Sequence, residues 1–258
     1  LKPWQATFMI VGIPGLILAL AAFFLKEPKR SEEHVNLDIG SDNKNIFLHL
    51  KEHKNTLIPM FGGLIFMALI FYSFSFWAPT MMIRAFDISL SEVGLILGVI
   101  TIISSIIGTI LAGAAVDYLR NKNYSDAPVR AAMIAVMLAL PPIVSLSFIN
   151  SEIGAWICIA LYLLFISSFA PLGLLAISGV STGSVKGQAA AIHAFLMMAF
   201  GLSLGPQLTA FFTDFIFADS NLLIYSISLS GLVVLPISAL FFKICLPRYR
   251  ESSQKILA

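Results

Sequence analysis

Long stretches without a charged side chain dominate this sequence. Six of them contain no Asp, Glu, Lys or Arg, and they span residues 5–25, 56–83, 93–116, 131–149, 153–185 and 220–242. In a seventh stretch, residues 187–213, His193 is the one titratable side chain. Each stretch supplies the ~20 apolar residues that an α-helix needs to cross a bilayer. None alternates polar and apolar residues with the period of two that a membrane β-barrel requires. We therefore expect an all-α membrane protein with seven transmembrane helices.

The composition excludes several other classes of protein. Only 12% of the residues are charged and 58% are hydrophobic, whereas soluble domains carry roughly 25% charged residues. No nucleophile elbow with Ser, His and Asp, no metal-ligand spacing and no phosphate-binding loop is present. No basic cluster interleaved with aromatic residues indicates a nucleic-acid surface. We expect a protein that is not an enzyme, needs no cofactor or metal, binds no nucleic acid and has the lipid bilayer as its surroundings.

The positions of the basic residues predict the orientation. Seven spans place alternate loops on the same side, and one set consists of residues 26–55, 117–130, 182–186 and the end of the chain from residue 243. This set holds every Lys and Arg except Lys2 and Arg84. Lys and Arg stay in cytoplasmic loops, so we expect the first residues outside and the C-terminus in the cytoplasm.

A short loop signature closes the third span. A glycine one turn before an aspartate allows close helix packing, and the aspartate can accept hydrogen bonds from a neighbouring helix end or a basic side chain. The stretch resembles a degenerate copy of the loop signature of the major facilitator superfamily. Three positions keep the usual residue type, namely Gly113, Asp117 and Lys122. Arg120 stands where glycine is usual, and Tyr118 and Asn121 stand where basic residues are usual.

Other stretches resemble the bacterial spinster-like permeases of the same superfamily, in the order of helices six to twelve. The stretches are 4–30 with Gly12-Ile-Pro14-Gly15, Trp77-Ala-Pro79 with Arg84, Ser91-Glu-Val-Gly94, and Gly201-Leu-Ser-Leu-Gly205-Pro206 with Asp214. The resemblance implies that residues 1–25 are the last transmembrane helix of an N-terminal half and 26–55 a cytoplasmic central loop. Residues 56–246 are then the six-helix C-terminal bundle, followed by a cytoplasmic tail at 247–258.

The resemblance also implies a function. The chain would be the C-terminal part of a secondary active transporter, a symporter that moves a small organic solute across a bacterial inner membrane by alternating access. No acidic residue lies near the middle of a span, because Glu92, Glu152, Asp214 and Asp219 all lie at span ends. A charge inside a span usually marks a coupling site. Proton coupling would therefore use the N-terminal half of the same transporter, unless transport is not driven by protons.

Polar and aromatic residues near the middle of helices seven, eight, ten and eleven are the substrate-cavity candidates, because in this superfamily those helices line the central cavity. The candidates are Tyr72, Ser73, Ser75, Trp77, Thr101, Ser104, Ser105, Tyr162, Ser167, Ser168 and His193. Each has a plain structural alternative: Ser and Thr also bond back to their own helix or join helices, and Trp77 is also placed to be an interfacial anchor. His193 either changes charge near neutral pH or stays neutral and bonds a neighbouring helix. An uncharged lining favours an amphiphilic or weakly charged solute.

Proline and glycine interrupt several spans. The positions at which we expect bends are Pro14, Gly15, Pro171, Gly205 and Pro206. Bent helices suit alternating access, but Gly and Pro are also commoner in membrane helices generally. Residues 26–55 mix both signs of charge and are expected to form a solvated linker with a short helix near 46–53, or to bind anionic lipid headgroups.

Two other functions remain open from the residues alone. Seven spans with this orientation also fit a seven-helix receptor or sensor, although a retinal protein needs a buried lysine in its last helix, where only Lys243 occurs, at the end. A membrane scaffold without transport activity is the other alternative.

Overall fold

The computed structural model describes residues 3–24, 46–181 and 183–257, and these residues are almost entirely helical. Six helical segments are long and apolar enough to cross a membrane, namely Lys54–Phe86, Leu90–Asn121, Ala127–Phe148, Glu152–Ser178, Val185–Phe217 and Ser220–Gln254. A further helix, α1 (Pro3–Ala22), carries a shorter apolar stretch at Phe8–Leu20. The expected all-α membrane fold is confirmed, with six full spans and α1 as the seventh apolar helix.

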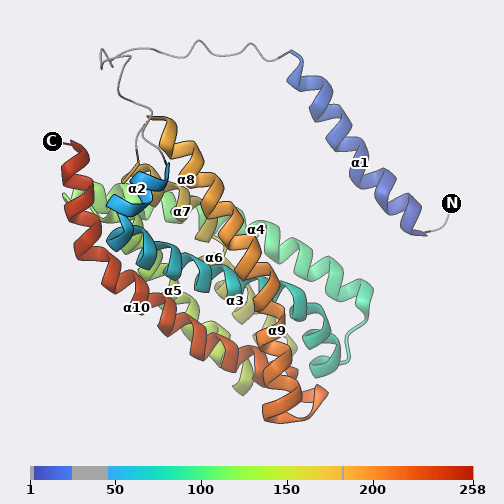
Figure 1. The fold of residues 1–258 in the computed structure, drawn as a ribbon. Helices are drawn as coiled ribbons and strands as arrows, with labels where there is room; N and C mark the ends of the chain where they lie inside the picture. The colour runs from blue at the N-terminus through green and yellow to red at the C-terminus, as the bar shows by residue number, and fades with distance from the viewer. Residues whose placement is uncertain (1–2, 25–45, 182, 258) are drawn as a thin grey trace. The chain divides into compact units, whose positions relative to one another are not determined.

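The chain divides into two units, Leu1–Ser41 and Asp42–Ala258. The first contains α1, within which Pro14 lies. The second is a bundle of six spans, and Figure 1 labels its helices. They are α2 (Ile46–Glu52), α3 (Lys54–Phe86), α4 (Leu90–Asn121), α5 (Ala127–Ser145), α6 (Glu152–Ile166), α7 (Phe169–Ser178), α8 (Gly183–Leu196), α9 (Ser203–Phe211) and α10 (Leu223–Leu257). Most of the central loop expected at 26–55 lies outside the described residues.

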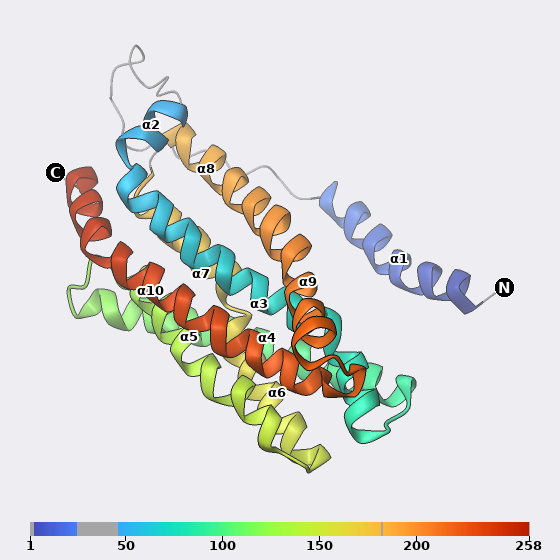
Figure 2. The ribbon, with the colours of Figure 1, turned by 60° about the horizontal axis from the view of Figure 1, so that its bottom comes forward.

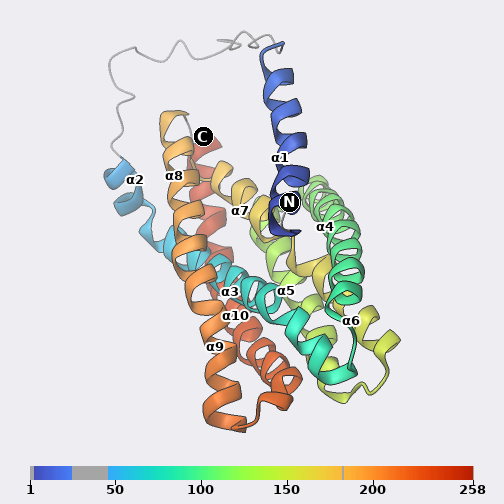
Figure 3. The ribbon, with the colours of Figure 1, turned by 90° about the vertical axis from the view of Figure 1, so that its right-hand side faces the viewer.

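Helix α3 is the centre of the bundle. In the most apolar 18-residue window of α3, 67% of the residues are buried, whereas the figure for α4 is 17%. Its buried face consists of large apolar side chains such as Met60, Met67 and Phe74, which pack against α10 on one side and α9 on another. Figure 3 shows α8 and α9 on one side of the bundle and α4 on the other, with α3 between them. One long apolar face, on α4, therefore has few protein neighbours.

Two of the spans are not regular α-helices. The span from Glu152 to Ser178 breaks at Ser167 and Ser168 into α6 and α7, with Pro171 in the first turn of α7. The span from Val185 to Phe217 contains two π-helical segments, η2 (Met197–Leu202) and η3 (Phe212–Phe217), on either side of α9. Proline at the start of a helix costs little, and π-helical segments commonly occur at functional sites.

The polar segments rich in Lys and Arg meet at one end of the bundle. Figure 2 shows α2, the start of α8 and the end of α10 at this end. Four contacts join the segments: His49 Nε2 with Ser181 Oγ (3.1 Å), Thr56 Oγ1 with Ser252 Oγ (2.8 Å), Arg250 Nε with Asp126 Oδ2 (2.8 Å), and Tyr249 Oη with the Ala176 carbonyl (2.8 Å). The short helix expected near 46–53 is α2, and its His49 is buried rather than solvated. Residues 247–257, expected as a tail, continue α10.

Candidate functional site

An open hollow lies between α3 and α4, next to one residue of α6. Its volume is about 490 Å³, and its lining is Phe74, Ser75, Ala78, Pro79, Gly94, Leu97, Gly98, Thr101, Ile102 and Leu163. Two glycines of α4 create the space, because they leave the α4 backbone without side chains opposite α3. No lining residue carries a charge, and the polar groups are hydroxyls. The sequence analysis identified two of these residues, Ser75 and Thr101, as candidates.

An aromatic cluster joins α3 to α7. The ring centroids of Phe71 and Phe169 are 5.1 Å apart, and that of Tyr72 is 5.4 Å from Phe71 and 6.0 Å from Phe169. Tyr72 is half-buried, and its ring packs close to Gly201 in the π-helical segment η2. Among the described residues its hydroxyl has no hydrogen-bond partner. Tyr72 therefore presents a free phenol where three spans meet.

Other candidates bond to neighbouring helices. The Ser73 hydroxyl shares hydrogen bonds with Thr209 (2.6 Å), which in turn shares one with Ser230 (2.8 Å). Trp77 Nε1 donates to the Pro206 carbonyl (2.8 Å), and the fully buried Tyr162 hydroxyl donates to the Ile70 carbonyl (3.1 Å). A carbonyl oxygen has two lone pairs, so the Pro206 carbonyl can accept the Trp77 bond in addition to a bond within its own helix.

The remaining serines have mostly local partners. Ser75 donates to the Phe71 carbonyl, Ser167 to Leu163 and Ser168 to Phe165, each within its own span. Such bonds satisfy a hydroxyl in an apolar environment without a second helix. Ser104 is buried in α4, and Ser105 is half-buried next to it. These positions remain proposed cavity residues; among them, Thr101 and Ser75 line the hollow between α3 and α4.

His193 occupies an apolar pocket in the span formed by α8, η2 and α9. It is 3% exposed, and its Nδ1 has no hydrogen-bond partner among the described residues. Its ring stacks on Phe61 at 6.3 Å with an interplanar angle of 12°. The ring also touches Gly173, where any side chain would collide with it. His193 thus packs between α3, α7 and α8, away from the hollow beside Thr101.

Two glycines permit close helix crossings. A Cβ atom at Gly205 in α9 would collide with the Leu69 carbonyl oxygen of α3. A Cβ atom at Gly108 in α4 would collide with the Leu164 carbonyl oxygen of α6. Gly205 was expected to mark a bend; its contact shows that it also brings α3 and α9 together. Small residues at such crossings are the usual means of helix packing in membranes.

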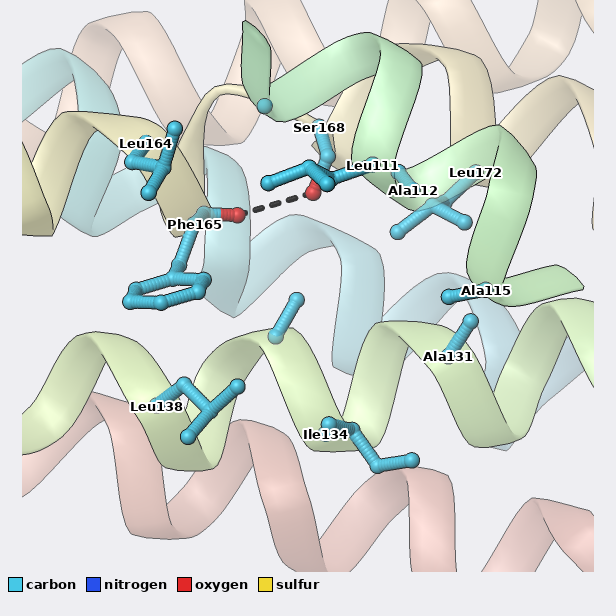
Figure 4. Close-up of a pocket in the computed structure, with 12 residues that line it drawn as sticks. Leu111, Ala112, Ala115, Ala131, Ile134, Leu138, Leu164, Phe165, Ser168 and Leu172 are labelled. Atoms are coloured by element: carbon cyan, nitrogen blue, oxygen red, sulfur yellow. Dashed lines mark hydrogen bonds between the residues drawn. The ribbon is translucent and has the colours of Figure 1, made fainter. Parts of the chain in front are cut away.

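A second, smaller cavity lies next to the Gly108 crossing. Figure 4 shows it between α4, α5 and the α6–α7 break, with the Ser168–Phe165 hydrogen bond at its edge. Its volume is about 130 Å³, and Ser168 is the only lining residue with a polar side chain. The other lining residues are alanines, leucines, Gly108, Ile134 and Phe165. Because apolar cavities of this kind stay dry, it offers little to a polar solute.

The loop signature at the end of α4 is solvated. Gly113 has no neighbour within 4 Å of where a Cβ would lie, and Asp117 and Arg120 are exposed. Lys122 Nζ lies 4.5 Å from the centroid of the Tyr118 ring. None of these residues lines the hollow between α3 and α4.

Asp126 is the buried acidic residue at this end, and the sequence analysis did not single it out. It is fully buried just before α5 and accepts hydrogen bonds from Arg130 (3.3 and 3.0 Å) and from Arg250 of α10 (2.8 Å). The spacing of Asp126 and Arg130, four residues apart at a helix start, was the available signal. The described residues contain no group of three His, Cys, Asp or Glu side chains placed to hold a metal.

Known proteins share this architecture. A bacterial homologue of the human lysosomal transporter Spinster, solved inward-facing and unoccupied, superposes with a TM-score of 0.62 at 18% identity, covering 98% of this chain and 60% of its own. The inward-facing, occupied structure gives 0.59 at 17% identity, with 97% and 58% covered. This chain thus spans about three fifths of those transporters. No curated protein matches its sequence. The family model of the Major Facilitator Superfamily matches residues 2–206. The chain therefore belongs to the major facilitator superfamily of membrane transporters.

Proposed function

We propose that this chain is the C-terminal part of a secondary active transporter that moves a small organic solute by alternating access. The observation that carries the proposal is the uncharged hollow of about 490 Å³ between α3 and α4, which opens onto the sparsely covered face of α4. Solute sites of such transporters lie between two helical bundles near the middle of the membrane. In this proposal the N-terminal half of the same transporter covers the α4 face and closes the other side of the hollow.

The chemistry of the hollow supports the choice of solute. Hydroxyls of Ser75 and Thr101 lie among Phe74, Leu97 and Leu163, so the lining offers hydrogen bonds and apolar contact without a charge. A pocket of this kind suits an amphiphilic or weakly charged organic molecule. Recognition of a charged group and coupling to protons would then use side chains of the N-terminal half, because the spans of this chain carry their acidic residues only at the ends.

Irregular helices support the mechanism. The break at Ser167 and the π-helical segments η2 and η3 provide positions at which helix ends can swing. Discontinuous helices next to the solute site are a recurrent feature of alternating-access transporters. In this proposal the Lys- and Arg-rich end lies in the cytoplasm, in a bacterial inner membrane. A receptor or scaffold function has no comparable structural support.

A transport assay tests the proposal. The complete transporter is reconstituted into liposomes that contain a pH-sensitive dye, and benzoate, lactate and lysophosphatidylcholine are added as probe solutes. At least one probe should drive proton entry. Thr101→Trp fills the hollow and should abolish this flux, whereas Leu232→Trp, on an exposed position of α10, should leave it near the original rate. Equal flux through both variants contradicts a solute path along α4.

A further inference from the structure

A second groove lies on the opposite face of the bundle, between α5 and α10. Its volume is about 620 Å³, within the range of roughly 300–1,000 Å³ that small-molecule sites occupy. The lining residues are Met133, Val136, Met137, Leu140, Leu235, Pro236, Ala239, Leu240, Lys243 and Leu246. All are apolar except Lys243, which is exposed. The groove is therefore an apolar channel along two neighbouring spans with a cation near one end.

More positive charge lies beyond Lys243 in the same direction. Arg130 precedes Met133 by one helical turn on α5, and Arg250 follows Leu246 by one turn on α10, so each shares the face of a groove residue. Both guanidinium groups contact the Asp126 carboxylate, Arg130 at 3.0 Å and Arg250 at 2.8 Å. Two cations on one carboxylate leave a net positive charge. Lys243 makes no hydrogen bond or ion pair with any described residue, so its charge is uncompensated.

We propose that this groove binds an anionic phospholipid from the leaflet at the Lys- and Arg-rich end. One acyl chain lies along Pro236, Ala239 and Leu240, and the phosphate contacts Lys243, with the Arg130–Asp126–Arg250 cluster next to it. The groove supplies apolar contact to any lipid tail, but only an anionic headgroup also neutralises the positive end. Basic pockets between transmembrane helices are known recognition sites for anionic headgroups. The site is separate from the hollow beside Thr101, and it does not require that the protein transports a solute.

A second copy of the chain fits this face poorly. In a twofold dimer the same patch meets itself, so Lys243 and the two arginines of one copy would face those of the other. Like charges brought together at an apolar interface oppose association. The charge pattern therefore favours a lipid over a homodimer.

Native mass spectrometry of the complete protein in detergent tests the proposal. The protein is titrated with phosphatidylglycerol and, separately, with phosphatidylcholine. The first phosphatidylglycerol should bind at least about fivefold more tightly, since one basic residue near the membrane surface contributes about that factor. Lys243→Gln should lower the affinity for phosphatidylglycerol about fivefold and leave phosphatidylcholine unchanged. Lys186→Gln, an exposed lysine at the start of α8, should change neither.

Two further variants separate the groove from surface charge. Ala239→Phe fills the groove and should weaken both lipids. Leu240→Trp places a fluorophore at the groove, and brominated phosphatidylglycerol should quench its fluorescence more than brominated phosphatidylcholine does. If the Ala239→Phe variant does not fold, this quenching measurement takes its place as the test. Equal affinities for the two lipids, equal losses with Lys243→Gln and Lys186→Gln, equal quenching by the two brominated lipids, or a lipid-free dimer that Ala239→Phe disrupts would each overturn the proposal.

Discussion

Asp126 shows how much a single buried carboxylate organises at the basic end of the bundle. It immediately precedes α5 and forms ion pairs with Arg130 of α5 and Arg250 of α10. Burial of a charge is tolerated when oppositely charged partners and hydrogen bonds surround it. Through this carboxylate the last turns of α10 are fixed to the loop after α4. The acidic residue that joins helices at this end is thus Asp126, whereas Asp117 of the loop signature is exposed.

Replacing Asp126 with Asn should destabilise the bundle. The change removes the charge between two guanidinium groups, and loss of one partner of a buried pair costs about 3–5 kcal/mol. Because Arg250 is about half exposed and water stabilises it in part, we expect a loss of about 2–3 kcal/mol in the free energy of unfolding. Unfolding in increasing SDS, followed by circular dichroism, measures it. Asp117→Asn is the matched control and should change the free energy by less than about 0.5 kcal/mol.

The sequence located the polar residues within the spans, but it did not show which residues they bond to. It marked Ser75 and Thr101 as polar groups in mid-span, and both line the hollow between α3 and α4. It could not separate them from Ser73, Trp77 and Tyr162, which bond to other helices. The partners of these three residues lie 136, 129 and 92 residues away in the chain, respectively. Hydrogen bonds between distant helices have no local sequence pattern. For Asp126 the local pairing with Arg130 was visible in the sequence, but its contact with Arg250, 124 residues away, was not.

At the scale of helices, the crossing of α3 and α9 is the contact that fixes the core next to the proposed solute path. Gly205 lies against the Leu69 carbonyl, and a few residues away Ser73 and Thr209 share a hydrogen bond of 2.6 Å. Backbone cannot move aside as a flexible side chain does. The separation of these two helices is therefore set by the absence of a side chain at residue 205.

Replacing Gly205 with Ala should separate α3 from α9. Overpacking typically costs about 1–3 kcal/mol, and better helix propensity returns at most about 1 kcal/mol, so we expect a net loss of about 1–2 kcal/mol. The midpoint of thermal unfolding of the purified protein should fall. Gly113→Ala makes the same chemical change where no atom lies within 4 Å. Its midpoint should stay or rise; an equal fall in both variants contradicts the packing account.

The helical elements were predictable because the charge-free stretches are long and their ends are charged. Six of the seven expected stretches coincide with full spans. The break between α6 and α7 and the π-helical segments were not predicted, although Pro171, Gly205 and Pro206 were noted as interruptions. The length of a charge-free stretch predicts the length of a span. Whether the span is locally α-helical or π-helical depends on the neighbouring helices, and η2 for example packs against α3.

At the scale of the whole molecule, the two faces of the bundle differ in what they need. The α5–α10 face ends in a cluster of positive charge and an apolar groove, as expected of a surface that meets lipid. The apolar part of α4, residues 93–116, carries no charge. Its most apolar window is only 17% buried, and the helix is hollowed beside Thr101. Both faces expose apolar side chains, and their exposure to water is unfavourable. In the proposed function the α4 face meets the N-terminal half of the transporter, and solute passes between them.

Cysteine labelling tests this central claim most directly. In a background with Cys158→Ala and Cys245→Ala, Thr101→Cys and Leu232→Cys are each introduced into the complete transporter and treated in membranes with a membrane-impermeant maleimide. A thiol in lipid stays protonated, and each unit of pKa lowers the reactive thiolate about tenfold. We predict that Thr101→Cys reacts at least about tenfold faster than Leu232→Cys and that a transported solute slows the reaction. Equal, slow labelling at both positions would contradict a water-filled solute path along α4.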